Sequence, residues 1–325
     1  HHQDLNLMMQ AWPRPETIIV NEWCWNPLAK RADIVLPCTT PLERDDMAMT
    51  PRDPYVVSMS KLTEPYGQAR DDFDIFAGIA QEMGVETAFS EGRSARDWQR
   101  WIYEQTMART AAAGIEIPGY DRFLQDGWFK LDDPAKPMIM LEAFRADPVA
   151  NALATPSGKI EIFCQTVADF GYDDCPGHPV WRDPYEWLGH VGDYPLHLIS
   201  NQPRDKLHSQ FDHGGVSKAK KVAGREPLHI NPDDAASRGL KDRDIVRLFN
   251  ARGACLGGVV IDDAMRPGVV QMSTGAWYDP DETGLCKHGN PNVLTRDKGT
   301  SKLGQGPSAH SCLIEIELFK DAPPP

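Results

Sequence analysis

LHINPDDAASRG, residues 228–239, is the stretch that decides the fold of the second half of the chain. Leu228–Ile230 predicts a short strand, and the residues that follow it predict a compact helix with clear end signals. Asn231 is suited to cap that helix, Pro232 fits its first turn, and Gly239 ends it. We therefore expect one small helix in a region that otherwise predicts strands.

Short strands are expected on both sides of this helix. We predict them at residues 196–200, 228–230, 245–250, 255–261, 269–273 and 312–318. Six short strands with one small helix favour a closed β-barrel, because closure removes the exposed strand edges. Residues 191–325 are therefore predicted to form a six-stranded β-barrel domain.

The first part of the chain alternates strands and helices. The segments 17–20 and 32–37 predict buried parallel strands, and a short helix is expected between them at 26–31. Residues 72–84 predict an amphipathic helix with acidic residues at its start and a glycine at its end. This alternation is typical of an open, Rossmann-like α/β sheet, and we assign residues 1–95 to it.

Residues 96–190 are less regular, and we interpret them as a connecting region wrapped over the α/β domain. Trp98–Ala113 predicts a helix, and Gly158–Phe163 predicts a short strand after a turn. Loops rich in proline, aspartate and tryptophan are expected in the rest of this region.

The composition excludes several classes of protein. The chain has 325 residues, of which 41% are hydrophobic, and its net charge of -13 argues against a nucleic-acid partner. No window approaches the roughly 18 consecutive apolar residues of a membrane span. The seven cysteines include no C-x-x-C pair, which favours reduced thiols over a disulfide scaffold or a metal site. We therefore expect a cytoplasmic protein, with a periplasmic one as the alternative.

Two segments of the barrel region are rich in polar side chains although strands flank them. The first runs from Ser200 to Gln210 and contains SNQP and LHSQ; the second starts with GNPNVLTRDKGTS at 289–301 and ends at 309–311. Amides, hydroxyls and imidazoles present donors and acceptors in fixed directions, as purine edges, ribose hydroxyls and pterin rings require. Each segment taken alone is equally compatible with ordinary turns.

Together these motifs resemble the molybdopterin-dinucleotide-binding domain of the DMSO reductase family. The match rests on Leu207–Gln210 after a strand that ends in Gln202-Pro203, and on residues 289–301. The front of the chain is similar to the same family at residues 1–4, 32–37, 42–46 and 69–74. The motifs follow the family's order over nearly the whole chain. The segment 171–179 makes the chain most similar to the biotin sulfoxide reductases, within the branch that reduces S- and N-oxides.

The resemblance implies a molybdenum enzyme with a double-psi type of barrel and a bis(molybdopterin guanine dinucleotide) cofactor. Its reaction would be the reduction of S-oxides, such as biotin or methionine sulfoxide, by oxygen-atom transfer. Reduction of trimethylamine N-oxide or dimethyl sulfoxide, or the chemistry of another branch, is the alternative within the family. A non-catalytic nucleotide- or partner-binding module is the alternative outside it, because a fold alone does not fix function. The matching motifs of the α/β half argue against that second alternative.

The resemblance also implies which residues contact the cofactor. One dinucleotide would be bound from the α/β domain by His1, Asn21, Glu22, Arg44 and Asp74. The pterin and nucleotide would be lined from the barrel by Ser200, Asn201, Gln202, Pro203, Lys206, His208, Ser209, Gln210, Asn292, Ala309 and His310. Arg44 can fork onto a phosphate, and Asp74 can accept from a guanine edge or a ribose. Lys206 stands where the family usually has arginine, which keeps the charge but loses the bidentate fork.

The ligand of the metal is expected outside this chain. In the oxide-reducing branch a serine of the N-terminal part binds molybdenum, and nothing here matches that part. We therefore expect no catalytic or metal-binding residue in this chain, and we predict that the polypeptide alone is inactive. Its expected partners are the N-terminal part of the same enzyme, a small S- or N-oxide, and an electron donor that the sequence does not identify.

Overall fold

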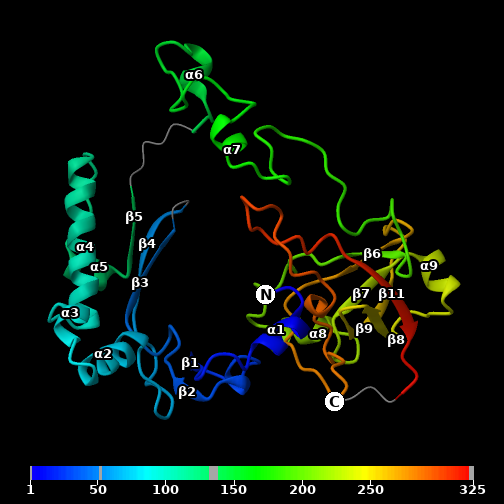
Figure 1. The fold of residues 1–325 in the computed structure, drawn as a ribbon. Coiled ribbons are helices and arrows are strands. Elements are labelled where there is room, and N and C mark those ends of the chain that lie inside the picture. Colours follow the sequence, from blue (N-terminus) through cyan, green and yellow to red (C-terminus); the bar gives the residue numbers. More distant parts are fainter. Residues whose placement is uncertain (1, 51–52, 132–137, 322–325) are drawn as a thin grey trace. The chain divides into compact units, whose positions relative to one another are not determined.

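The computed structural model describes residues 2–50, 53–131 and 138–321 (Figure 1). The chain divides into two compact units. One is Thr17–Glu142, and the other combines His1–Glu16 with Ala143–Pro325. We refer to them as the front unit and the barrel unit. The domain boundaries expected from the sequence, after residues 95 and 190, stay predictions.

Six strands of the barrel unit close into a barrel in the order β10-β6-β11-β8-β9-β7 (Figure 1). Their bounds are Leu196–Ile199 (β6), Pro227–Ile230 (β7), Ile245–Asn250 (β8), Gly253–Ile261 (β9), Val269–Met272 (β10) and Leu313–Leu318 (β11). The pairs β10–β6 and β7–β9 are parallel, and the other neighbours are antiparallel. All six predicted strands occur, and the predicted closed barrel is confirmed.

Most barrel strands turn alternate side chains into the core, whereas β9 is buried continuously from Ala254 to Val259. On β8, for example, Val246 and Leu248 are fully buried while the residues between them are half-exposed. The short helices of this unit are Gly215–Lys220 (α8), Pro232–Ser237 (α9) and the 3-10 turn Pro291–Val293 (η2). As predicted, Asn231 caps α9, its side-chain oxygen accepting from the Asp233 amide at 2.9 Å.

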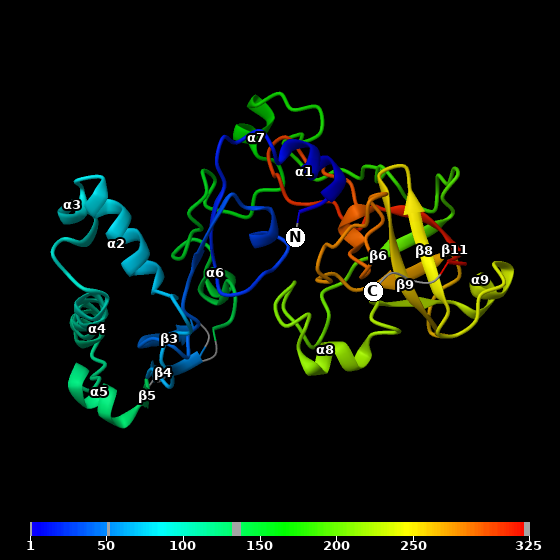
Figure 2. The same cartoon turned by 90° about the horizontal axis from the view of Figure 1, so that it is seen from below.

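Helix α1 (Leu5–Ala11) packs against the barrel, although the barrel strands begin about 190 residues later in the sequence. In both views the blue α1 lies beside the orange loop that precedes β11 (Figures 1 and 2). Leu5 is only 6% exposed and belongs to the barrel's hydrophobic core. Asn6 donates to the Arg252 carbonyl at 2.9 Å and accepts from the Tyr278 hydroxyl at 3.2 Å. The first residues, assigned by sequence to the α/β portion, therefore complete the barrel unit.

This contact predicts the effect of Leu5→Ala. Removing a buried leucine side chain from the core should lower the free energy of unfolding of the barrel unit by about 2–5 kcal/mol. Leu7→Ala, on the exposed side of the same helix, should change it by only about 0.5 kcal/mol. Urea unfolding followed by tryptophan fluorescence measures both, and equal effects would contradict the packing of α1 on the barrel.

The front unit holds two small sheets and four helices among its described residues. β1 (Ile19–Glu22) and β2 (Ile34–Pro37) are parallel as predicted, and a 3-10 turn, Ala29–Arg31 (η1), lies between them. The predicted burial of both strands is wrong: Val20 alone is buried in this pair, because a two-stranded sheet has no further strands to cover it. A three-stranded antiparallel sheet contains Asp46–Thr50 (β3), Asp53–Met59 (β4) and Trp128–Lys130 (β5). The helices are Asp72–Glu82 (α2), Glu86–Ser90 (α3), Ala95–Ala112 (α4) and Tyr120–Asp126 (α5).

The helices expected at 72–84 and 98–113 are confirmed as α2 and α4. The antiparallel sheet was not expected, and its own core consists of Val56, Tyr103, Tyr120 and Phe123. Along the chain, the short helices Glu142–Ala146 (α6) and Gln165–Asp169 (α7) follow β5 and precede β6.

The prediction of a strand at Gly158–Phe163 is wrong. This segment forms no ladder with any described strand, and Ile160 and Ile162 are 64% and 78% exposed. Local apolar alternation cannot make a strand where no partner strand is available to satisfy the backbone groups.

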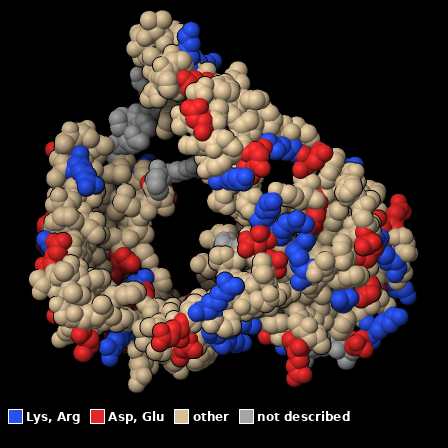
Figure 3. Space-filling model, in the orientation of Figure 1, with Lys and Arg blue, Asp and Glu red and all other residues tan. Residues whose placement is uncertain are grey.

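No helix in the described ranges combines the length and the apolar content needed to cross a bilayer. On the visible face of the barrel unit, acidic and basic side chains are intermixed (Figure 3).

Candidate functional site

Arg44 and Asp74, thirty positions apart in the sequence, line one cavity of the front unit. Its volume is about 330 Å³, within the range of roughly 300–1,000 Å³ that is usual for small-molecule sites. Arg44 lies in the loop between β2 and β3, and Asp74 in the first turn of α2. The other lining residues are Glu43, Asp45, Lys61, Pro65, Ala69, Arg70, Asp71, Ala95, Arg96 and Gln99.

Hydrogen bonds tie the Arg44 side chain to the start of α2. One terminal nitrogen donates to the Thr39 carbonyl at 2.9 Å, and Nε lies 3.6 Å from an Asp46 oxygen. The Thr39 hydroxyl in turn donates to Asp71, the residue before α2, at 2.7 Å. Arg44 therefore forms an ion pair with Asp46 and also lies at the cavity.

Glu43, which the sequence interpretation overlooked, folds the loop that carries Arg44. Its buried carboxylate accepts from the Thr40 amide at 2.7 Å, the Thr40 hydroxyl at 2.9 Å and the Tyr66 amide at 2.7 Å. These donors hold the pKa of Glu43 below its ordinary value. Gln99 of α4 also lines the cavity and donates to the Asp45 carbonyl at 2.8 Å. Nothing local in the sequence marks Gln99 or Arg96, because they meet the loop only in the tertiary fold.

Asn21 and Glu22 lie at the carboxyl end of β1, where parallel sheets commonly bind ligands. The Asn21 amide donates to Asp72 at 3.0 Å, which links β1 to the first turn of α2. Glu22 accepts from the Asn26 amide at 2.5 Å. Neither residue lines the cavity that Arg44 and Asp74 share. His1 lies outside the described residues.

The loop after β6 carries most of the barrel residues in question. Ser200 is buried, Asn201 and Pro203 are half-buried, and Gln202 is exposed with its side chain donating to the Lys206 carbonyl at 2.8 Å. His208, Ser209 and Gln210 are exposed at the tip of the loop.

A turn at Gly275 fixes the tip of this loop. Gly275 has a φ of +106°, and a Cβ there would lie 1.8 Å from the His208 carbonyl oxygen. Trp277 follows it and donates from its ring nitrogen to the Ser209 carbonyl at 2.9 Å. Only glycine permits this approach of the two backbones.

Lys206 lies beneath the loop rather than on it. Its ammonium group is buried and contacts Asp212 at 2.7 Å and Glu226 at 2.9 Å. Lys221 binds the same Asp212 carboxylate at 2.8 Å. Burial acts to lower the pKa of Lys206, but the two carboxylates raise it above its ordinary value. In the same network burial raises the pKa of Glu226.

The second polar segment lies next to the same turn. Asn292 is buried in η2, and the neighbouring Asn290 donates to the Ala276 carbonyl at 2.8 Å. Since Ala276 lies between Gly275 and Trp277, the turn joins both polar segments. Ala309 is half-buried and His310 exposed, at the end of the loop that leads to β11.

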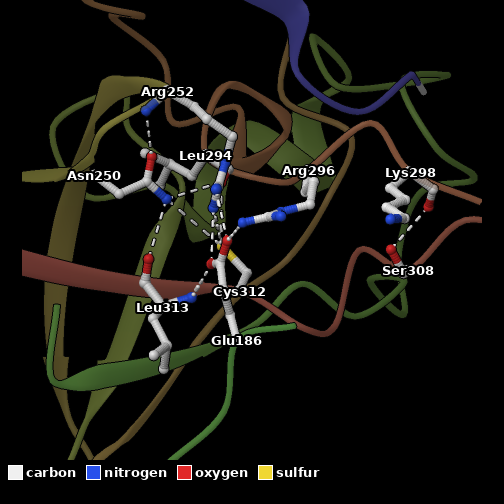
Figure 4. Close-up of polar contacts among 9 residues, drawn as sticks. All are labelled: Glu186, Asn250, Arg252, Leu294, Arg296, Lys298, Ser308, Cys312 and Leu313. Carbon is white, nitrogen blue, oxygen red and sulfur yellow. Dashed lines mark hydrogen bonds and ion pairs between the residues drawn. The ribbon is translucent and has the colours of Figure 1, made fainter. Parts of the chain in front are cut away.

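Glu186, a residue that no motif marked, holds this second segment to the connecting region (Figure 4). Its carboxylate accepts from Arg252 at 2.6 and 2.9 Å, from Arg296 at 2.8 Å and from the Leu313 amide at 2.9 Å. Burial opposes the charge, but these four donors hold the pKa of Glu186 below its ordinary value. The nearby Cys312 thiol donates to the Leu294 carbonyl at 3.3 Å, and burial raises the pKa of Cys312 to about 12. The role of this cluster is therefore structural: Glu186 joins the connecting region to Arg252, Arg296 and the start of β11.

The structure thus brings most of the candidate cofactor-binding residues into two groups. The front unit joins Arg44 to Asp74, and the barrel unit gathers its two polar segments around residues 275–277. Among the described residues, no group of three or more His, Cys, Asp or Glu side chains could hold a metal ion.

Comparison with known proteins gives two family matches. Residues 1–82 match the molybdopterin oxidoreductase family, and residues 196–313 match the molydopterin dinucleotide binding domain. The biotin sulfoxide reductase of Cereibacter sphaeroides is 45% identical over 322 residues, which cover 98% of this chain and 43% of that protein. The trimethylamine-N-oxide reductase of Haemophilus influenzae is 42% identical over 331 residues, which cover 98% of this chain and 40% of that protein. The chain therefore spans about two fifths of the length of these curated relatives.

Among solved structures, the acetylene hydratase of Pelobacter acetylenicus superposes with a TM-score of 0.72 at 19% identity. The superposition covers 98% of this chain and 42% of that one. At this identity the similarity concerns the fold alone.

Proposed function

Because this chain belongs to the molybdopterin oxidoreductases, we propose that it forms the C-terminal part of a molybdenum enzyme that reduces S-oxides. In this proposal it binds the guanine dinucleotide ends of a bis(molybdopterin guanine dinucleotide) cofactor. The observation that carries it is the cavity that Arg44 and Asp74 share, because it combines a cation for phosphate with a carboxylate for a base or a ribose.

The residues present suit such a group. The cavity of about 330 Å³ has room for a nucleotide end, and Arg44 reaches it while its position is fixed from behind by Thr39. Asp74 accepts hydrogen bonds and so favours a guanine edge, which offers two neighbouring N–H donors. In the barrel unit, the exposed side chains of His208, Ser209 and Gln210 would contact the pterin or nucleotide from a loop that Gly275 holds in place.

The bound cofactor supplies the oxygen-atom transfer, and the protein supplies binding, orientation and electrostatics. Besides His208, Ser209 and Gln210, the barrel residues that would bind and orient the cofactor are Ser200, Asn201, Gln202, Pro203, Asn292, Ala309 and His310. Asn21 and Glu22 would extend the site at the end of β1. Lys206 would act beneath the loop through its ion pairs with Asp212 and Glu226.

A second candidate is the reduction of trimethylamine N-oxide or dimethyl sulfoxide. It is favoured by relatives with that activity in their names, which are 41–42% identical to this chain, close to the 45% of the biotin sulfoxide reductase. In either case the rest of a longer protein would supply the other cofactor-binding residues, the metal ligand and the docking site of an electron donor.

The compartment is proposed from the cysteines. All seven are free thiols, which supports a reducing, cytoplasmic compartment.

The cavity of the front unit predicts the effect of Asp74→Asn. Guanosine diphosphate should bind the 325-residue chain more tightly than adenosine diphosphate, and the substitution should weaken guanosine diphosphate binding by about tenfold or more. Arg44→Gln should weaken the binding of both nucleotides, because it acts on the phosphates. Titration calorimetry measures each dissociation constant.

Glu104→Gln, an exposed carboxylate on α4 away from the cavity, is the matched control and should leave binding unchanged. Equal affinity of the wild-type chain for both nucleotides would count against the proposal. Sulfoxide reduction by the isolated 325-residue chain would overturn the expectation that it is inactive alone.

A further inference from the structure

The barrel unit has a second cavity, of about 180 Å³, between the loop after β6 and helix α8. Its walls include Asn201 and Arg204 from the loop and Ser217, Lys220 and Lys221 from α8 and its end. None of the α8 residues belongs to a motif of the family resemblance. The cavity is smaller than the roughly 300–1,000 Å³ of sites for whole organic ligands, so its size suits a single compact group.

Positive charge is in excess around this cavity. Its lining holds four basic residues against two carboxylates, Asp205 and Glu226. A third carboxylate, Asp212, lies beneath and accepts from Lys206 and Lys221. One positive charge is still unmatched, in a chain whose net charge is -13. Such an excess favours an anionic ligand.

Two polar groups at the cavity are not satisfied by the protein. Ser217 is only 5% exposed, and its hydroxyl has no hydrogen-bond partner within the described ranges. A buried hydroxyl without a partner costs stability and therefore calls for a ligand or another role. Arg204 likewise has no ion-pair or hydrogen-bond partner among the described side chains. Lys220 is exposed and forms an ion pair with Asp205 at 3.3 Å.

We propose that this cavity is a binding site for a phosphate or diphosphate group, with Arg204, Ser217 and Lys220 as its ligands. Guanidinium and ammonium groups form charge-assisted hydrogen bonds to phosphate oxygens, and the serine hydroxyl donates a neutral one. The group can come from the diphosphate of the nucleotide cofactor or from a free phosphate. The first source rests on the proposed function, while the site itself does not.

The test uses inorganic pyrophosphate on the 325-residue chain at low salt, followed by amide chemical shifts and titration calorimetry. Saturable binding with shifts at residues 204, 217 and 220 is the expected result. Arg204→Gln and Lys220→Gln should each weaken binding by about tenfold. Arg247→Gln is the control and should have no effect, because this half-exposed arginine of β8 pairs with Glu317 of β11 and does not line the cavity.

Ser217→Ala separates binding from folding. It removes a hydroxyl that no described residue satisfies, so the midpoint of thermal unfolding should not fall, whereas pyrophosphate binding should weaken several-fold. Pyrophosphate binding that is absent, or is unchanged in all three variants, would overturn the proposal.

Guanosine diphosphate distinguishes the two sources. If it displaces pyrophosphate from this cavity, the group is the cofactor's diphosphate; if it binds without displacing it, the site takes free phosphate. Asp74→Asn reports on the proposed function through a different cavity in the other unit. Failure of one test therefore leaves the other intact.

Discussion

Glu186→Gln should lower the free energy of unfolding of the barrel unit by about 3 kcal/mol, the low end for a broken buried ion pair. The substitution leaves Arg252 and Arg296 close together without the carboxylate that both contact. It also removes the charged acceptor of the Leu313 amide at the start of β11. Unfolding in urea at neutral pH measures the loss.

Glu317→Gln is the matched control for this prediction. Glu317 lies on the same strand and pairs with Arg247, but its side chain is 54% exposed. A surface pair of this kind contributes about 0–1 kcal/mol. Equal losses in the two variants would contradict the role assigned to Glu186.

The same carboxylate makes the stability of the barrel unit depend on pH. The folded state holds the pKa of Glu186 below the ordinary value of 4.5. Its contribution is therefore fully present above pH 4.5 and is lost as the pH falls through the lower folded value. The difference in stability between the wild type and Glu186→Gln should shrink over that acidic range, and a constant difference would count against this linkage.

Lys206→Met should cost about 3–5 kcal/mol, because it leaves Asp212 and Glu226 buried without their shared ammonium group. Lys221 still neutralises Asp212, so the larger penalty falls on Glu226. Lys206→Arg keeps the charge and should recover part of the loss. Lys241→Met, an exposed lysine of the same unit, should change the stability by only about 0.5 kcal/mol.

A double variant identifies the cause of that loss. Burial already raises the pKa of Glu226, and without Lys206 it should rise further, so that the residue takes up a proton. Lys206→Met should therefore be less damaging at pH 5 than at pH 8, and adding Glu226→Gln should restore stability at the higher pH. A loss that is independent of pH and not rescued by Glu226→Gln would show that packing, and not charge, is the cause.

Local signals in the sequence predicted the barrel and its helix well. Six short strand candidates around one small helix indicated the barrel, and Asn231 and Pro232 mark the start of α9 without help from distant residues. The parallel pairing of β1 and β2 was predicted from two short apolar runs, but their burial was not, because it depends on what else covers the sheet. The segment Gly158–Phe163 shows the limit of this reasoning, because a strand also needs a partner.

The sequence by itself, through periodic side chains, end signals and motif order, determined the closed barrel, the parallel pair and the family. Only the tertiary structure decided that α1 completes the barrel unit, that Arg44 and Asp74 share a cavity, and that Glu186 binds two arginines. It also decided that the Lys206 ammonium lies beneath the polar loop, where Asp212 and Glu226 hold it. The physical reason is separation: periodicity and capping act over a few residues, whereas these contacts join groups whose proximity exists only after the chain has folded.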